Sequence, residues 1–295
     1  MILLWGLLDD SPMLFVYQEL MKLKADVFFL NHADILETNI AFREGNPPLY
    51  ILNYKNVSYN LNDFSSAYLR PYDFRVYGQC IKASPKLLSD AYLLHQCMNN
   101  WAEYTNRPVI NKPVASSSNN SKLYQAVIIE KAGLLVPPSL VSNEREKINQ
   151  FYHQHEMIIY KSMSGIRSIV EKYSPDLLPA GKPLGLMFFQ KYIEGQNVRV
   201  HVAGSRVFAN IITTTGVDYR YAPYTMEEYK LPDNISEKCI LLNKKFGLLL
   251  SGIDLILTPD NEWYCLEVNT NPGYSFFDRG TGNPIAAAIA ELLME

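Results

Sequence analysis

Near its C-terminus the chain contains two apolar segments of extended character on either side of a run of turn residues. The first is Gly252–Ile256 and the second is Trp263–Asn269, and the residues between them include Pro259, Asp260 and Asn261. This order is typical of two antiparallel strands joined by a tight turn. We therefore predict a β-hairpin whose turn is centred on Asp260 and Asn261.

The predicted hairpin brings three oxygen-bearing side chains together. With this turn, residues whose numbers sum to a constant face each other, so Asp254 lies directly opposite Glu267. Side chains alternate along a strand, so Asn269 projects on the same face as Glu267, and directly opposed residues lie about 5 Å apart at Cβ. Two carboxylates and an amide oxygen suit a hard cation such as Mg²⁺, or Mn²⁺ in its place, that also carries nucleotide phosphates.

The alternative is a surface hairpin with ordinary acidic residues. It is disfavoured because Glu267 and Asn269 are expected to share the face of Trp263 and Cys265 in an otherwise apolar strand. A charge on such a face needs a partner, because burying an unpaired charge is costly. We therefore predict that Asp254, Glu267 and Asn269 form a metal site.

The composition limits the classes of partner. The chain has 295 residues, 48% of them hydrophobic, and 27 basic against 30 acidic residues give a net charge of −3. This balance offers no basic surface, so we expect neither nucleic acid nor a membrane as partner. The four cysteines lack paired metal-ligand spacing and favour reduced thiols in the cytoplasm. Met1–Leu8 has no basic stretch before it and is typical of a first strand rather than a signal peptide.

Strand-like and helix-like segments alternate over the first hundred residues, which predicts an α/β domain over residues 1–110. No glycine-rich fingerprint follows the first strand, so this domain is not expected to bind a dinucleotide. The stretch Asn106–Asn120 is rich in Ser and Asn and is predicted to be a linker. Two further domains are predicted over residues 111–187 and 188–295.

Two lysines stand at the ends of predicted elements. Lys122 opens a helix, and Lys161 ends the buried strand Met157–Tyr160. The loop Ser162–Ser168, which includes Ser164, consists largely of small residues that would let backbone amides approach an anion. Each lysine taken alone is also compatible with a solvated surface position.

A second hairpin is predicted from Val198–Ala203 and Arg206–Ile212, with the turn at Gly204. Counting across it places Arg199 opposite Asn210, on the face away from the valines of the first strand. A polar pair on the protein surface is the alternative for these two side chains.

Taken together, these segments resemble the ATP-grasp superfamily from about Asn111 to the last helix. Lys122 precedes the sequence Gly-Leu-Leu-Val-Pro-Pro, and Lys161 ends a strand before a loop of small residues. The segment Gln190–Ile193 resembles the one that binds adenine, and the hairpin residues resemble the metal triad. These motifs occur in the order that the superfamily has.

Within the superfamily the chain is most similar to the branch of the ribosomal-protein glutamate ligase and the microviridin-type peptide ligases. The likeness rests on Asn197–Val200, on Asp218–Arg220 and on the closing Glu-Val-Asn-x-Asn-Pro-Gly, with a fainter match at Leu69–Pro71. It implies an α/β and α+β protein in which an N-terminal pre-ATP-grasp lobe precedes two α+β lobes that clasp the nucleotide.

The resemblance also implies an activity. Such ligases use ATP to convert a carboxylate into an acyl phosphate, which an amine or hydroxyl group then attacks, releasing ADP and phosphate. A peptide or an amino acid is the expected substrate, small-molecule ligation of free amino acids is an open alternative, and a homodimer is compatible with this interpretation.

The resemblance assigns roles residue by residue. Asp254, Glu267 and Asn269 are expected to bind the metal, and Arg199, Asn210 and Arg220 are expected to be catalytic. The residues expected to bind ATP are Lys122, Lys161, Ser164, Gln190, Lys191, Tyr192, Ile193 and Asn197.

Two positions depart from the pattern of the relatives. Asn197 stands where many relatives have a carboxylate for the ribose, and Gly252 stands where D-alanine ligases have an arginine. The second departure argues against a D-alanine-type substrate geometry. The alternative from a different functional class is a non-catalytic ATP-binding sensor. Such a sensor is expected to lack a metal ligand or a phosphate-binding lysine, and this chain has all of them.

Overall fold

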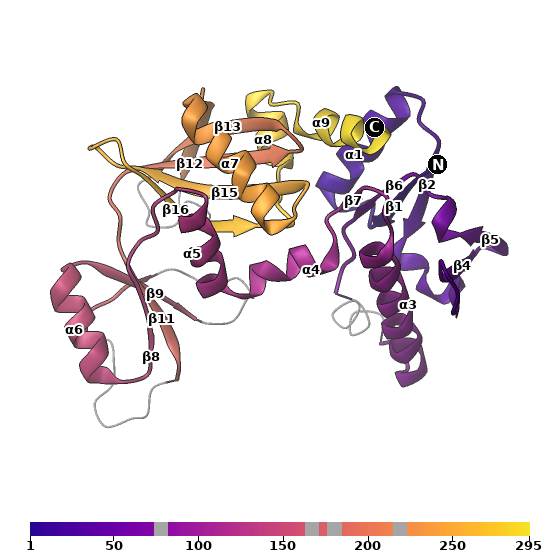
Figure 1. Cartoon of the computed structure of the whole chain (residues 1–295), viewed down its shortest axis with the longest axis horizontal. Helices are drawn as coiled ribbons and strands as arrows, with labels where there is room; N and C mark the ends of the chain where they lie inside the picture. The colour runs from indigo at the N-terminus through magenta and orange to yellow at the C-terminus, as the bar shows by residue number, and fades with distance from the viewer. Residues whose placement is uncertain (74–81, 163–170, 176–184, 215–222) are drawn as a thin grey trace.

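The computed structural model describes residues 1–73, 82–162, 171–175, 185–214 and 223–295. Within these residues the strands form four sheets, which Figure 1 shows distributed along an elongated molecule. The same residues include no helix with the length and hydropathy of a membrane span.

The N-terminal sheet is parallel, with the strand order β2-β1-β6-β7. Its strands are β1 (Ile2–Gly6), β2 (Val27–Asn31), β6 (Ser66–Leu69) and β7 (Val109–Ile110). Leu4 packs with helix α1 (Ser11–Lys22), whereas Trp5 packs with helix α3 (Pro85–Tyr104) on the other face. Burial on both faces explains why β1 is a continuous apolar run.

A second, antiparallel sheet has the strand order β3-β4-β5 and extends from this unit. Its elements are β3 (Thr38–Arg43), β4 (Leu49–Tyr54) and β5 (Val57–Asn60), next to the 3₁₀ turns η1 (His32–Glu37) and η2 (Leu61–Asp63). Leu52 joins the core beneath α3. The α/β character predicted for the N-terminal region is confirmed.

The prediction of a linker over Asn106–Asn120 is wrong. This stretch contains β7, helix α4 (Pro113–Ser116) and the 3₁₀ turn η3 (Ser117–Asn120). Its residue Asn111 is buried, and the side-chain amide hydrogen-bonds the backbone of Leu249, Leu250 and Thr270. Polar side chains therefore fix this stretch to the C-terminal sheet, an arrangement that composition does not reveal. The domain limits 1–110, 111–187 and 188–295 stay a prediction.

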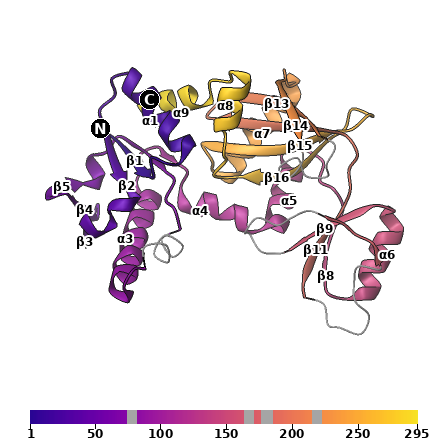
Figure 2. The ribbon, with the colours of Figure 1, turned by 180° about the vertical axis from the view of Figure 1, so that it is seen from behind.

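A small antiparallel sheet has the strand order β10-β9-β11-β8. Its elements are β8 (Ser139–Ser142), β9 (Ile158–Ser162), β10 (Glu171–Lys172), β11 (Met187–Lys191) and the covering helix α6 (Arg145–His155). Figure 2 shows it at the opposite end of the molecule from β4 and β5. The predicted limit between residues 187 and 188 falls inside β11.

The largest sheet is antiparallel, with the strand order β14-β13-β12-β15-β16. Its strands are β12 (Gln196–Ala203), β13 (Arg206–Thr214), β14 (Tyr224–Glu228), β15 (Leu250–Leu257) and β16 (Trp263–Asn269). Val198, Val200 and Val202 point into a core that contains residues of α5 (Lys122–Lys131) and α7 (Asp233–Phe246). The predicted faces of β12 are confirmed.

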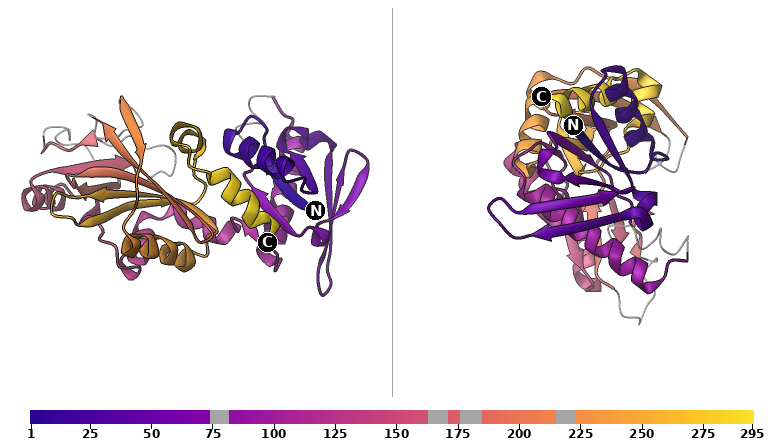
Figure 3. Two further views of the ribbon diagram at one scale, coloured as in Figure 1. Left: turned by 90° about the horizontal axis from the view of Figure 1, so that it is seen from above. Right: turned by 90° about the vertical axis from the view of Figure 1, so that its right-hand side faces the viewer.

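The other face of this sheet is covered near one end by α8 (Ser275–Thr281) and α9 (Ile285–Met294). Helix α9 also packs on α1, and the hydroxyl of Ser66 in β6 donates to the carbonyl of Leu293. Figure 3 shows α9 in yellow between the large sheet and the N-terminal unit. The N-terminal unit and the large sheet therefore share one core, which places the carboxyl ends of β1 and β6 beside the segment that follows β16.

Candidate functional site

The hairpin of β15 and β16 pairs the two predicted carboxylate ligands. Asp254 lies directly opposite Glu267, and Gly252 lies opposite Asn269. The predicted pairing is confirmed. Among the described residues no group of three or more His, Cys, Asp and Glu side chains gathers to hold a metal, so the predicted site depends on the amide oxygen of Asn269 as its third donor.

The turn of this hairpin differs from the prediction. Asn261 has a left-handed backbone with a φ of 62°, and the amide of Thr258 donates to the carbonyl of Glu262 at 3.0 Å. The turn is therefore centred on Asp260 alone, so the residues that face each other next to it are offset by one from the predicted pairing. A register shift between Asp254 and Leu255 then restores the predicted pairing. The alternation of side chains along the strands predicts neither the left-handed backbone of Asn261 nor the bulge.

The bulge also changes which residues share a face. Cys265 and Val268 both enter the core beneath α7, with Trp263 packed against it. Because Glu267 and Asn269 flank Val268, they project to the other face. The prediction that Glu267 and Asn269 share the face of Trp263 and Cys265 is wrong. The two ligands instead lie on the face that β12 presents through Arg199.

Each predicted carboxylate ligand is opposed by a cation. Arg199 Nη1 donates to both carboxylate oxygens of Asp254 at 2.8 Å. Lys122 Nζ lies 3.7 Å from Oε2 of Glu267. The Arg199 side chain is only 7% exposed, so its charge acts in an environment of lower dielectric than water. Arg199, predicted to be catalytic, and Lys122, predicted to bind ATP, therefore meet two predicted metal ligands at one place.

The position of Arg199 is set by two neighbours. Burial, with a smaller effect of the Arg199 charge, holds the pKa of His201 well below its usual value. The neutral ring therefore accepts a hydrogen bond from Arg199 Nε, at 3.4 Å. On β15, a Cβ at Gly252 would lie 2.7 Å from Cζ of Arg199. Gly252 thus leaves the space that the guanidinium occupies.

Asn210 faces Arg199 across β12 and β13, as predicted. Both side chains are buried, so the alternative of a surface polar pair is wrong. The Asn210 amide donates to the hydroxyl of Thr281 at 2.9 Å and accepts from Asn283 at 3.0 Å. Asn210 thereby fixes the segment between α8 and α9, and its catalytic role stays a prediction.

The predicted adenine segment connects the small sheet to β12. The amide of Lys191 donates to Pro138 at 2.9 Å, the amide of Tyr192 donates to Met157 at 3.0 Å, and the Gln190 side chain donates to Ser139 at 3.1 Å. The amides of Lys191 and Tyr192 are therefore already bonded within the protein. Ile193 follows in the same crossover.

Asn197 lies on β12 two residues before Arg199, which places both on one face of the sheet. Other predicted site residues lie outside the part of the chain that the structure describes. These are Ser164 and Arg220, and also the side chain of Lys161, whose backbone lies in β9 opposite Phe188.

One charged residue was missed as a candidate. Arg70 follows β6, and its guanidinium contacts the carboxylate of Asp10 and the side-chain oxygen of Asn271. The same group donates to the carbonyl of Pro272 at 3.1 Å. The N-terminal unit therefore reaches the segment that carries Asn269. The available signal was the position of Arg70 at the carboxyl end of a parallel strand, where ligands bind in open α/β sheets.

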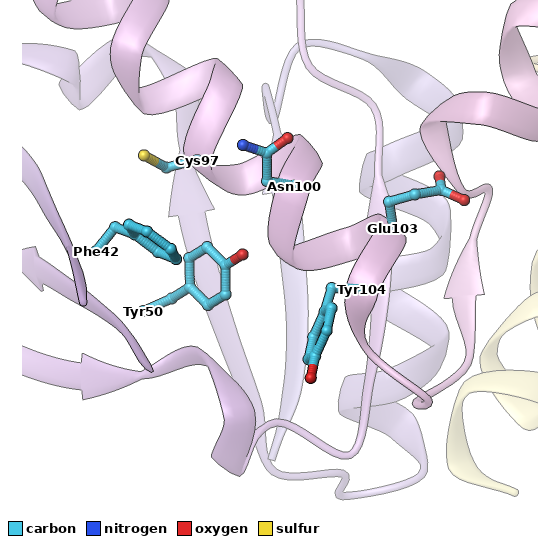
Figure 4. A pocket seen from close by; sticks show the side chains of 6 residues that line it. All are labelled: Phe42, Tyr50, Cys97, Asn100, Glu103 and Tyr104. Atoms are coloured by element: carbon cyan, nitrogen blue, oxygen red, sulfur yellow. The ribbon is translucent and has the colours of Figure 1, made fainter. Parts of the chain in front are cut away.

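A pocket of about 400 Å³ lies elsewhere, between β3, β4 and α3. Figure 4 shows that Phe42 and Tyr50 form one side and that Cys97, Asn100 and Tyr104 line the helix side. None of the predicted site residues lines this pocket.

Comparison with known proteins finds relatives with similar sequences. A probable alpha-L-glutamate ligase of Vibrio atlanticus is 26% identical over 200 residues, which are 62% of this chain and 66% of that protein. The chain thus spans slightly less than two thirds of that relative. The human beta-citrylglutamate synthase B is 27% identical over 110 residues, covering 35% of this chain and 28% of that protein.

Solved structures that are similar over 99% of this chain include a macrocyclase and an ATP-grasp ligase. The macrocyclase MdnC of Microcystis aeruginosa, bound with its precursor peptide MdnA, has a TM-score of 0.81 at 20% identity, with 99% of that chain covered. The ATP-grasp ligase PsnB, complexed with a variant of its minimal precursor, Mg and ADP, has a TM-score of 0.82 at 23% identity, with 97% covered. These likenesses establish the ATP-grasp fold. Residues 119–293, more than half of the chain, match the family described as the RimK-like ATP-grasp domain, and the chain belongs to that family.

Proposed function

We propose that this protein is an ATP-dependent ligase that joins a carboxylate to an amine or a hydroxyl group and releases ADP and phosphate. The observation that carries the proposal is the meeting of Asp254 and Glu267 with Arg199 and Lys122 beside Asn269. Family membership supports it, because the relatives are named as ligases. We further propose a peptide or an amino acid as the substrate.

The donor set fits Mg²⁺. Two carboxylates and an amide oxygen on adjacent strands are hard oxygen ligands, and Mg²⁺ takes one or two carboxylates together with substrate phosphates. Asp254, Glu267 and Asn269 are the residues that would hold it, and Mn²⁺ suits the same donors. When bound, Mg²⁺ would neutralise charge on the β- and γ-phosphates.

The two cations have a defined part in this proposal. Lys122 and Arg199 neutralise the carboxylates of Glu267 and Asp254 through ion pairs. Phosphate oxygens would compete for both cations, so Lys122 and Arg199 would turn from the carboxylates toward the nucleotide. Their charges would then oppose the repulsion between the phosphates and the attacking carboxylate, which is the main electrostatic barrier of phosphoryl transfer.

The reaction has two balanced steps. A carboxylate oxygen of the substrate forms a bond to the γ-phosphorus, and the bond between that phosphorus and the ADP oxygen breaks. The amine or hydroxyl group then attacks the acyl carbon, loses its proton, and phosphate leaves with the former carboxylate oxygen. We propose that Arg199, and with it Asn210 and Arg220, contact the transferred groups during these steps.

The nucleotide base would lie near the crossover from the small sheet to β12. We propose that the carbonyls of Gln190–Ile193 contact adenine and that Asn197 contacts the ribose. Lys161 and Ser164 are proposed as phosphate contacts of the small sheet and its following loop.

A peptide substrate is supported by the similar structures, which hold precursor peptides. A cytoplasmic location is proposed from the need for ATP and from the free thiols of Cys97, Cys239 and Cys265. A homodimer stays a prediction.

The test is ATP turnover with candidate carboxylate substrates, above all short peptides encoded by neighbouring genes. Release of ADP and phosphate is measured with and without an amine or hydroxyl nucleophile, and hydroxylamine serves as a trap for the acyl phosphate. Glu267→Gln should bind no Mg²⁺ productively and should release no ADP above background. If ATP and Mg²⁺ bind but no acceptor ever yields ADP, the non-catalytic sensor is the correct interpretation.

A further inference from the structure

Among the described residues, the outer edge of β16 is completed by one backbone bridge and by one side chain rather than by another strand. In the sheet order β16 is the last strand. Near its start, Leu135 makes a short parallel bridge to Tyr264: its amide donates to the carbonyl of Trp263 and its carbonyl accepts from the amide of Cys265. Farther along, towards the predicted metal ligands, the backbone of β16 is bonded by the amide side chain of Gln125.

Gln125 binds both backbone groups of one residue. Its Nε2 donates to the carbonyl of Val268 at 2.6 Å, and its Oε1 accepts from the amide of Val268 at 3.0 Å. A primary amide carries a donor and an acceptor in one plane, as a peptide group does, so it can replace a neighbouring strand. Gln125 is buried, at 4% exposure, so water does not compete for these bonds.

The bonded residue lies between two predicted metal ligands. Val268 stands directly between Glu267 and Asn269, and its own side chain is held in the core. Fixing the peptide groups on both sides of Val268 restricts the backbone dihedrals from which Glu267 and Asn269 project. The clamp therefore acts on the spacing of the two ligands.

The same helix face carries the lysine that contacts Glu267. Gln125 follows Lys122 by three residues in α5, and residues at this spacing are neighbours on a helix surface. Ile129, one further turn along, anchors α5 in the core of the large sheet. One helix thus fixes the backbone at Val268 and the charge opposite Glu267.

We propose that Gln125 is a positioning residue for the metal site, which holds Glu267 and Asn269 at the separation that Mg²⁺ requires. This inference rests on the proposed function. Gln125 itself contacts neither metal nor substrate in this role; it acts through the backbone of Val268. Residues that orient metal ligands typically contribute 10–100-fold to affinity or activity.

A purely structural clamp is distinguished by a matched control. Asn243 in α7 is also buried and also uses its amide to bond the large sheet, through the carbonyl of Val202 and the hydroxyl of Ser251. Asn243 lies on the α7 side of the sheet, away from the ligands. Gln125→Leu and Asn243→Leu each remove one buried amide, and both should lower the free energy of unfolding.

The experiment measures Mg²⁺ affinity by calorimetry in the full chain saturated with ADP, together with amide hydrogen exchange of the metal-free protein. Gln125→Leu should raise the apparent Kd for Mg²⁺ by about tenfold or more and speed exchange over residues 267–269. Asn243→Leu should leave both unchanged while losing comparable thermal stability. Gln125→Glu, which keeps only the acceptor, serves if the leucine variant does not fold, and it should also weaken Mg²⁺ binding.

The outcomes separate the two proposals. Wild-type protein that binds neither Mg²⁺ nor ADP would overturn the proposed function. If the wild-type protein binds Mg²⁺ and ADP, and both Gln125 variants bind Mg²⁺ with a Kd within twofold of the wild-type value, the positioning role alone would be overturned. An equal rise in Kd for Asn243→Leu would likewise overturn it, because the effect would then follow stability rather than the clamp at Val268.

Discussion

Arg199 and Asp254 face each other directly on β12 and β15, and one guanidinium nitrogen donates to both carboxylate oxygens at 2.8 Å. A predicted metal ligand is thereby paired with a predicted catalytic residue. In the proposed site, the charge of Arg199 would compete with Mg²⁺ for Asp254 before nucleotide binds and would act together with Mg²⁺ on the phosphates afterwards.

Arg199→Met should therefore separate metal binding from turnover. Without nucleotide, Mg²⁺ should bind several-fold more tightly, because Asp254 no longer has a competing cation. ADP release should fall by about 100-fold or more, the loss typical when one transition-state donor is removed. Mg²⁺ titration and ADP release check the two effects. Arg206→Met, which breaks an exposed pair with Glu291, is the control and should change neither. Equal or weaker Mg²⁺ binding in Arg199→Met would contradict the competition.

Gly252→Ala should lower activity through Arg199. The added Cβ would lie 2.7 Å from Cζ of Arg199 and 2.8 Å from Cβ of Pro272. The guanidinium is the end of a flexible side chain and can move away, so we expect a folded protein destabilised by about 1–3 kcal/mol. ADP release should fall toward the level of Arg199→Met. Gly185→Ala adds the same methyl group where nothing lies within 4 Å and should have no effect.

Arg70 should couple the N-terminal unit to the segment after β16. Its guanidinium contacts Asp10 and also Asn271 and Pro272, so it joins two parts of the chain some 200 residues apart. A double-mutant cycle with Arg70→Met and Asn271→Ala, which spans the two parts of the chain, should give a coupling free energy of about 0.5–3 kcal/mol in urea unfolding. If the losses of unfolding free energy in the two single variants simply add, the interaction between the two side chains contributes nothing to stability.

The local pattern of residues sufficed for the pairing of Asp254 with Glu267 and for the opposition of Arg199 and Asn210, because adjacent strands of a hairpin share one short turn. It failed at the faces of β16, because a bulge reverses the alternation between Cys265 and Glu267. Periodicity has no signal for an inserted residue.

Contacts between distant segments were also beyond the sequence. The pair of Arg199 and Asp254 depends on β12 lying beside β15, which no turn between them specifies. The bonds from Gln125 and Asn111 to the backbone after β15 are of the same kind. The run of Ser and Asn residues around Asn111 predicted a linker. Composition cannot distinguish an asparagine whose side chain bonds buried backbone from an asparagine in an exposed loop.

A buried histidine, His32, and a partly buried one, His95, should make the protein less stable in acid. Burial lowers the pKa of His32 and of His95 to about 4 in the folded protein, and their Nε2 atoms lie 3.4 Å apart. An unfolded histidine has a pKa of about 6.5, so between about pH 6.5 and 4 the unfolded chain binds more protons than the folded one. The free energy of unfolding should fall with decreasing pH across this window, by up to about 1.4 kcal/mol per pH unit for each histidine. Urea unfolding at pH 7, 6 and 5 measures the slope, which should become shallower in His95→Gln but not in the exposed His153→Gln. An unchanged slope in His95→Gln would show that other groups cause the acid sensitivity.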